Sequence, residues 1–72
     1  MATNQQAAAW SAPYLGVQHL TGKTSRASVT DYGSFAELLR WFPGCGFSPI
    51  KSQHASASEA REAGAKWLAE AA

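Results

Sequence analysis

The sequence predicts an α+β two-layer sandwich, in which a three-stranded antiparallel sheet with strand order 2-1-3 carries two helices on one face. Three observations lead to this fold class. Stretches that alternate apolar and polar residues, as half-buried strands do, are interspersed with stretches whose apolar residues recur at helical spacing. The connections between them are short, which favours antiparallel neighbours. A chain of 72 residues has room for one domain only. The predicted order of elements is ββαβα.

The first 13 residues are predicted to be a flexible N-terminal arm, followed by a single compact domain over residues 14–72. The arm is polar and rich in alanine, it ends at Pro13, and Trp10 is its one aromatic residue. A terminal segment with no periodic apolar face has nothing to hold it against a core.

Two strands are predicted in the first half of the domain, over residues 14–20 (YLGVQHL) and 26–32 (RASVTDY). The intervening TGKTS contains a glycine among small polar residues and suits a hairpin loop. Alternation in the second strand places Ala27 and Val29 on one face. We expect this face, together with Val17 of the first strand, to lie beneath both helices.

The first helix is predicted over residues 34–42. Ser34 and Glu37 have the spacing of a capping box, in which each side chain satisfies a free backbone N–H at a helix start. The apolar residues of this segment recur at the spacing that forms one stripe on a helix. They are Phe35, Leu38, Leu39 and Phe42. Pro43 and Gly44 then end the helix.

A third strand and a second helix are predicted in the last third of the chain. The strand spans residues 47–55, and Pro49, which has no backbone N–H to donate to a neighbouring strand, favours an edge position. Ser56 and Glu59 form a second capping box. The inner stripe of the helix that follows is rich in small residues, which favours close packing on the sheet. Its members are Ala60, Ala63, Gly64, Trp67, Leu68 and Ala71.

Composition and charge exclude several classes of protein. Hydrophobic residues make up 46% of the chain, too many for an intrinsically disordered protein. Six Lys and Arg against five Asp and Glu give a net charge of +1, whereas a dedicated nucleic-acid binder carries a basic patch and a DNA mimic is acidic. A single cysteine forms no internal disulfide, so we expect a reducing, cytoplasmic location. No apolar run is long enough to span a membrane, and no signal peptide is predicted.

The sequence predicts neither an enzyme nor a metal or cofactor site. Cys45 with His19 or His54 is the one pairing that could form a nucleophile and a base. However, Cys45 follows the end of a predicted helix, where the helix dipole disfavours a thiolate. The same three residues lack the spacing of a zinc site. Gly44 and Gly46 come after a predicted helix, whereas phosphate-binding loops precede one, so we interpret this turn as a helix stop.

Six residues are predicted to bind a partner. Four belong to the sheet face that the helices leave open, and two lie at the end of the first helix beside a rigid Pro-Gly turn. Trp, Tyr and Arg dominate the binding energy of protein interfaces. The six residues are Tyr14, Arg26, Tyr32 and Lys51 on the face and Arg40 and Trp41 at the helix end. Trp41 also has a second interpretation, as a residue at the boundary of the core.

These residues predict a non-enzymatic module that binds another protein. The alternative is a small nucleic-acid-binding or regulatory protein that uses the same face. It rests on four cations outside the last helix, which together with the two tyrosines could contact phosphates and bases. The cations are Lys23, Arg26, Arg40 and Lys51.

The stretch DYGSFAELLRWFPGCGF, residues 31–47, resembles part of the small phage-encoded anti-CRISPR proteins that act on type I surveillance complexes. The shared features are a strand, a capped helix, a Trp-Phe pair and a P-G-x-G turn. The resemblance implies a compact α+β inhibitor, encoded by a phage or another mobile element, that binds a host protein complex. The net charge of +1 differs from family members that mimic DNA with acidic surfaces. The implied mechanism is therefore steric occlusion of a protein surface, and no contact residue of the family is carried over.

Overall fold

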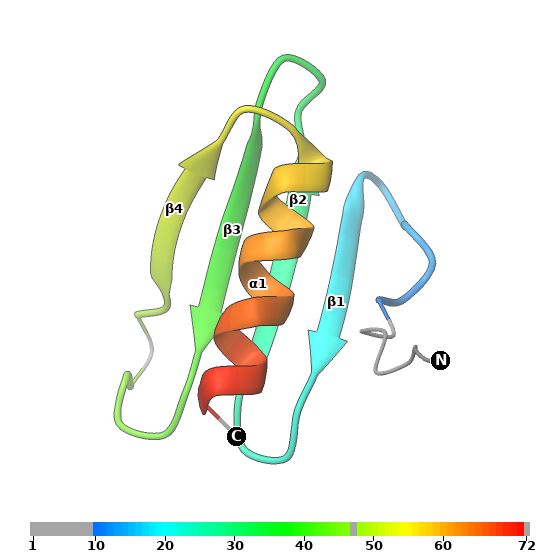
Figure 1. Ribbon diagram of the computed structural model, residues 1–72. Coiled ribbons are helices and arrows are strands. Elements are labelled where there is room, and N and C mark those ends of the chain that lie inside the picture. The colour runs from blue at the N-terminus through cyan, green and yellow to red at the C-terminus, as the bar shows by residue number, and fades with distance from the viewer. Residues whose placement is uncertain (1–9, 47, 72) are drawn as a thin grey trace.

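The computed structural model describes residues 10–46 and 48–71 and shows two layers (Figure 1). Four strands form one antiparallel sheet in which each strand neighbours the next along the chain: β1 (Val17–Thr21), β2 (Arg26–Asp31), β3 (Ala36–Trp41) and β4 (Ile50–His54). One helix, α1 (Ala57–Ala71), lies across one face of the sheet, mainly over β2 and β3. The fold is α+β, but the predicted three-stranded sheet of order 2-1-3 with two helices is wrong.

Residues 34–42, predicted to form a helix, contain β3 instead. Two periodicities overlap in this segment, because Leu38 and Leu39 fit both a helical stripe and an alternating strand. In the strand, Ala36 and Leu38 are buried in the core, at 0% and 1% exposure, while Leu39 projects from the opposite face. The helical prediction assigned both leucines to one face, and the sheet separates them.

The turn before β3 decides between helix and strand. The N–H of Tyr32 donates to the carbonyl of Phe35 at 2.9 Å, which closes a hairpin with two central residues. Gly33 has a φ of +94°, as the first central residue of a type II′ turn does, and its N–H donates to the Asp31 carboxylate at 2.8 Å. The turn returns the chain along β2, so the backbone groups of β3 pair with neighbouring strands rather than within a helix.

The register between β1 and β2 determines which side chains α1 covers. Gln18 pairs with Val29, and paired residues share one face of a sheet. Leu20 follows on the same face and is buried, and Gln18 accepts a hydrogen bond of 3.0 Å from the Arg61 guanidinium of α1. The expectation that Val17 would share the covered face with Val29 is therefore wrong, because Val17 lies on the other face.

Helix α1 begins where the capping box predicts. The Ser56 hydroxyl accepts a hydrogen bond of 3.2 Å from the N–H of Glu59. Ala60 and Gly64 are buried on the inner side of the helix, so the helix backbone lies close to the sheet. A Cβ atom at Gly64 would lie 3.0 Å from the Leu38 side chain, so a larger residue fits there only if its neighbours shift.

Trp10, expected in a flexible arm, packs against the core. Its indole ring would lie 3.1 Å from a Cβ atom at Gly64. The segment that follows runs beside β1, where the N–H of Ser11 donates to the carbonyl of His19 at 2.8 Å and the N–H of His19 donates to the Ser11 hydroxyl at 2.9 Å. Of the arm predicted over residues 1–13, residues 1–9 lie outside the described residues, whereas Trp10 and Ser11 are held by the domain.

The core between the two layers is small. Leu20 is buried in it, and five further buried residues form a cluster in which only two, Leu38 and Val29, have large side chains. The remaining three are Ala27, Ala36 and Ala60. Trp10 and Trp67 are partly buried against this cluster. Because aromatic side chains carry a large apolar area, these two tryptophans contribute a substantial share of the burial available to a domain of this length.

The contact between Trp10 and Gly64 predicts coupled effects on stability. Gly64→Ala is expected to lower the free energy of unfolding by about 1 kcal/mol, because the strain of the added methyl exceeds the gain in helix propensity. In a Trp10→Ala background the contact with the indole is gone while the 3.0 Å contact with Leu38 remains, so Gly64→Ala should be less destabilising than in the native protein. Urea denaturation of the four proteins measures this coupling. Equal effects of Gly64→Ala in both backgrounds would show that Trp10 does not occupy this space.

Candidate binding surface

The face of the sheet opposite α1 has no element packed on it among the described residues (Figure 1). We call it the open face. Alternation along the four strands and the register between them place eleven side chains on it. They are Val17, His19, Thr21, Arg26, Ser28, Thr30, Glu37, Leu39, Trp41, Lys51 and Gln53. Three of the predicted binding residues, Arg26, Trp41 and Lys51, are therefore brought onto one surface.

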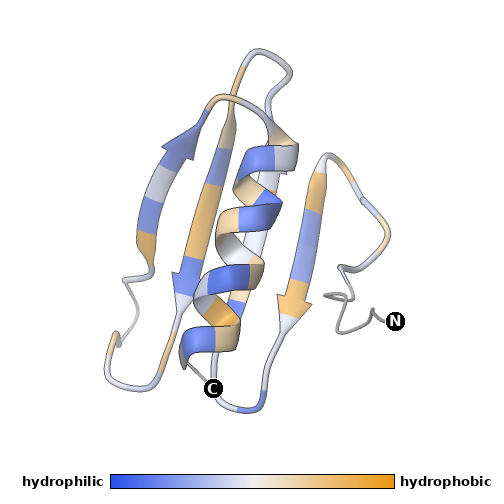
Figure 2. Ribbon diagram, viewed as in Figure 1, coloured by the Kyte–Doolittle hydropathy of each residue, from blue (hydrophilic) through white to orange (hydrophobic). Residues whose placement is uncertain are grey.

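An apolar side chain, that of Leu39, lies in the middle of the open face. Figure 2 shows a hydrophobic stretch at the centre of β3 between hydrophilic residues. In the sequence of β3 this stretch consists of Leu38, which lies in the core, and Leu39, which pairs with Ser28 on one side and Lys51 on the other. Leu39, Val17 and Trp41 are all partly exposed. Antiparallel sheets with one solvent-facing side usually carry polar residues there. An apolar side chain in the middle of such a face is therefore a feature that a partner would bury.

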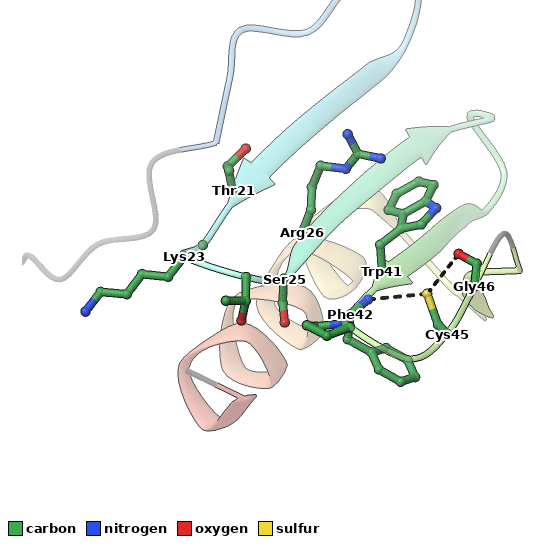
Figure 3. A pocket seen from close by; sticks show the side chains of 11 residues that line it. Thr21, Lys23, Ser25, Arg26, Trp41, Phe42, Cys45 and Gly46 are labelled. Carbon is green, nitrogen blue, oxygen red and sulfur yellow. Dashed lines mark hydrogen bonds between the residues drawn. The ribbon is translucent and has the colours of Figure 1, made fainter.

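Arg26 and Trp41 form a cation–π pair at one end of the open face. They lie directly opposite each other in the register of β2 and β3, and the Arg26 guanidinium carbon is 4.4 Å from the centre of the Trp41 ring (Figure 3). This distance lies well within the range of cation–π attraction. The ring restricts the motion of an exposed arginine, so the guanidinium is held in position.

Glu37 and Lys51 form an ion pair nearer the other end, with 3.7 Å between the Lys51 ammonium and the Glu37 carboxylate. An exposed pair of this kind contributes little to stability. It does neutralise the one acidic residue on the open face. Glu37, predicted to cap a helix, thus has a role in the sheet instead. Among the described residues, no carboxylate lies within ion-pair distance of Arg26.

A pocket of about 400 Å³ lies beside the cation–π pair. The loop between β1 and β2 forms one wall with Lys23 and Thr24, and the loop after β3 forms the other with Cys45 (Figure 3). The Cys45 thiol accepts a hydrogen bond from the N–H of Phe42 at 3.5 Å and donates one to the carbonyl of Gly46 at 3.7 Å. Cys45 therefore helps to shape the loop.

Arg40 and Trp41, predicted to lie together at a helix end, point to opposite faces. They are consecutive residues of a strand, and consecutive strand residues alternate. Arg40 pairs with Ala27 and lies on the side of α1, partly buried. Its Nε atom is buried and has no hydrogen-bond partner among the described residues. The structure therefore separates Arg40 from the other predicted binding residues.

The two predicted tyrosines lie near the end of the sheet opposite Arg26. Tyr32 is 54% exposed and stacks on Phe35, with 4.9 Å between ring centres, in the turn between β2 and β3. Tyr14 is 76% exposed and pairs with Val17 in a tight turn before β1. Because paired residues share one side of a sheet, Tyr14 extends the apolar part of the open face beyond Val17.

Sequence reasoning missed Val17, Leu39 and Leu15. The first two were assigned to the buried side of the sheet or helix, and the alternation from Glu37 to Leu39 was the signal for the open face. Leu15, next to Tyr14, is 84% exposed. The residues around Leu15 do not indicate whether it lies in an exposed turn or in a strand.

The residues considered for catalysis or metal binding are not brought together. His19 is exposed on the open face, His54 shares a hydrogen bond of 2.9 Å with Ser52 on the side of α1, and Cys45 lies in the loop at the other end of the sheet. The described residues contain no group of three His, Cys, Asp or Glu that could hold a metal ion. They also include no helix that is long and apolar enough to cross a membrane.

Comparisons with protein-family models, curated proteins and solved structures find no match to this chain or its structure. The open face therefore has to be interpreted from its own geometry.

The turn that carries Tyr14 is strained. The backbone groups of Tyr14 and Val17 exchange two hydrogen bonds of 3.0 Å around the central residues Leu15 and Gly16. Leu15 has a φ of +53° and Gly16 a φ of +80°, as in a type I′ turn. A left-handed conformation is costly for a leucine, whereas asparagine and glycine adopt it readily.

We expect Leu15→Asn to raise the free energy of unfolding by about 1 kcal/mol, because asparagine suits the left-handed position. Leu15→Ala is the matched control, since it removes the same exposed side chain but keeps the unfavourable backbone conformation. Thermal and urea denaturation compare the three proteins. If the asparagine and alanine variants proved equally stable, the strain would not lie at this residue.

The cation–π geometry predicts coupling between Arg26 and Trp41. Arg26→Gln and Trp41→Leu, made singly and together, are expected to show an interaction free energy of about 0.5–1 kcal/mol. Arg26→Lys should retain part of it, because a lysine ammonium also interacts with the ring. A double-mutant cycle in urea measures the coupling. Additive single effects would argue against the contact.

Proposed function

We propose that the protein is a non-enzymatic binding module that uses its open face to bind the surface of another protein. The observation that carries the proposal is the position of Leu39, an apolar residue in the middle of a sheet face that no described element covers. Removing apolar surface from water is the main driving force of protein association. Trp41 is the next residue of β3 on this face after Leu39, whereas Val17 lies on β1, with β2 between it and Leu39.

The rest of the open face suits the rim of a protein interface. Such interfaces combine an apolar centre with a polar border and are enriched in Trp, Tyr and Arg. Here the border holds charges of both signs, with Arg26 and Lys51 as cations and Glu37 as the anion. A surface of mixed sign matches another protein better than the uniformly negative backbone of a nucleic acid.

The strained turn before β1 supports the same proposal. Tyr14 and Leu15 are both large, and the solvent-exposed position of Leu15 is maintained in an unfavourable backbone conformation. Strain of this kind concentrates at functional positions. A hairpin tip that presents two apolar side chains beside the open face would add contact area at its margin.

Nucleic-acid binding is the second candidate, favoured by the cation–π pair of Arg26 and Trp41, since arginine and aromatic side chains can contact phosphates and bases. Glu37 neutralises Lys51, however, which leaves Arg26 as the unpaired cation of the open face among the described residues. A backbone-tracking groove needs a series of cations. The protein partner is therefore the first candidate.

The narrower form of the proposal rests on the sequence resemblance of residues 31–47 to anti-CRISPR proteins, of which the Trp-Phe pair and the P-G-x-G turn remain, because β3 takes the place of the capped helix. It makes the partner a host protein complex, such as a type I CRISPR surveillance complex, which the module would block by occupying a surface. Binding to a purified complex of this type, with loss of its capture of target DNA, is the direct assay of this form.

Capture of a partner by immobilised protein tests the proposal. Leu39→Thr removes apolar surface at the centre of the open face and introduces a β-branched residue, which suits a strand. We expect it to weaken capture at least tenfold, whereas Lys66→Gln on the exposed side of α1 should leave capture unchanged. Circular dichroism confirms that each variant is folded. Mass spectrometry identifies the captured protein, and titration with that purified protein gives the affinities.

Unchanged affinity of Leu39→Thr would show that the open face is not the binding surface. Nuclease treatment and salt separate the two candidates. If capture requires nucleic acid, or if affinity for an oligonucleotide falls by about 10³ between 50 and 200 mM salt, the nucleic-acid function replaces the proposed one.

A further inference from the structure

The pocket beside Arg26 and Trp41 differs in charge from the rest of the molecule. Its lining includes two cations, Lys23 and Arg26, and no carboxylate. The acidic residues of the sheet lie toward its other end, because Glu37 pairs with Thr30, four residues along β2 from Arg26. At strand spacing this separates the two rows by about 13 Å. The residues that line the pocket therefore carry two positive charges and no negative one, on a nearly neutral protein.

The contacts of Arg26 leave its guanidinium available to bind an anion. Its guanidinium carbon lies 4.4 Å from the centre of the Trp41 ring, and no ion pair with a carboxylate occupies its N–H groups among the described residues. A guanidinium offers five N–H donors in a planar fork that matches the two oxygens of a carboxylate. Because the ring already restricts the side chain, less conformational entropy is lost when the fork binds.

Three residues with hydroxyl groups also belong to the pocket. Thr21, Thr24 and Ser25 contribute to the lining, and Ser25 is nearly buried, at 8% exposure. Hydroxyls can donate to a carboxylate oxygen that a single arginine leaves unsatisfied. In Figure 3 the Lys23 side chain extends away from the Trp41 ring, so Lys23 adds charge at the rim rather than a contact at the centre.

We infer that this pocket binds the carboxylate of an Asp or Glu side chain on the protein partner, with Arg26 as its principal ligand and Trp41 as the residue that positions Arg26. The inference rests on the proposed function and adds the chemistry of the partner. One pocket with a single well-positioned cation fits one carboxylate. A nucleic-acid backbone carries a phosphate on every nucleotide and would require further cations in line with the pocket, and Glu37 and Lys51 cancel each other there.

Nuclear magnetic resonance titration tests the pocket without the partner. The probes are two capped tripeptides, acetyl-Gly-Glu-Gly-amide and its isosteric neutral counterpart acetyl-Gly-Gln-Gly-amide, at constant ionic strength. We expect the Glu peptide to shift the Arg26 Nε–H and Trp41 indole N–H signals saturably, and the Gln peptide to bind at least tenfold more weakly. Arg26→Gln should weaken binding of the Glu peptide about tenfold, as expected for loss of a charged hydrogen-bonding group. Lys66→Gln, which removes an equal charge from α1, should have no effect.

Arg26→Lys separates geometry from charge. It keeps the cation but lacks the planar fork, so it should bind the Glu peptide more weakly than the native protein while remaining better than Arg26→Gln. Equal shifts by the Glu and Gln peptides, or an unchanged affinity in Arg26→Gln, would overturn the inference. Tighter binding of inorganic phosphate or of oligo(dT) than of the Glu peptide would also overturn it and assign the pocket to phosphate.

The capture assay distinguishes this inference from the proposed function. If Leu39→Thr abolishes capture while Arg26→Gln leaves it intact, the open face binds a partner but the pocket takes no acidic side chain. If the pocket binds the Glu peptide and Leu39→Thr captures normally, the proposed use of the open face fails while the carboxylate site stands as a separate site.

Discussion

The close approach of α1 to the sheet is the constraint on which the rest of the structure depends. Ala60 and Gly64 on the helix meet a sheet surface that includes Ala27 and Ala36, so backbone approaches backbone with little side chain between them. Leu38 and Trp10 fill the space that remains. Packing at this density tolerates neither a void nor an extra methyl group. Trp10, which comes from outside the regular elements, is therefore part of the core.

The same constraint leaves the open face uncovered. A single helix of 15 residues spans only the middle of a four-stranded sheet, and it can cover one side. Strand alternation nevertheless sends Val17, Leu39 and Trp41 to the other side. Their contact with water is a cost that the described part of the chain does not remove. The charged residues around them are arranged locally, with Glu37 paired to Lys51 and Arg26 held on Trp41. This combination of an apolar residue with ordered polar groups is the physical basis of the proposed binding function.

The part of the fold that depends on residues close together in the sequence could be predicted. Pairing between residues far apart in the sequence determined the rest. The start of α1 was predictable because Ser56 and Glu59 are three residues apart and interact directly. The segment before β3 has the same spacing in Ser34 and Glu37, but Gly33 closes a hairpin there and the capping box does not form. Over six residues the helical and strand periodicities of the leucines coincide, so the sequence pattern alone could not distinguish a helix from a strand.

The candidate site was also predictable in part. Arg26, Trp41 and Lys51 lie on one face, as expected. Arg40, which was predicted to lie beside Trp41 at a helix end, lies on the other face.

The sequence by itself determined the α+β class, the position of α1, the near-neutral charge and the lack of a catalytic or metal-binding pattern, because these properties depend on neighbouring residues or on composition. Only the tertiary structure decided which side chains are covered. A shift of one residue in the register of a strand exchanges its two faces. The register of β1 is supported by a contact such as that of Gln18 with Arg61, which are 43 residues apart. No pattern within one strand contains that information, so the composition of the open face followed from the packing of the helix on the sheet.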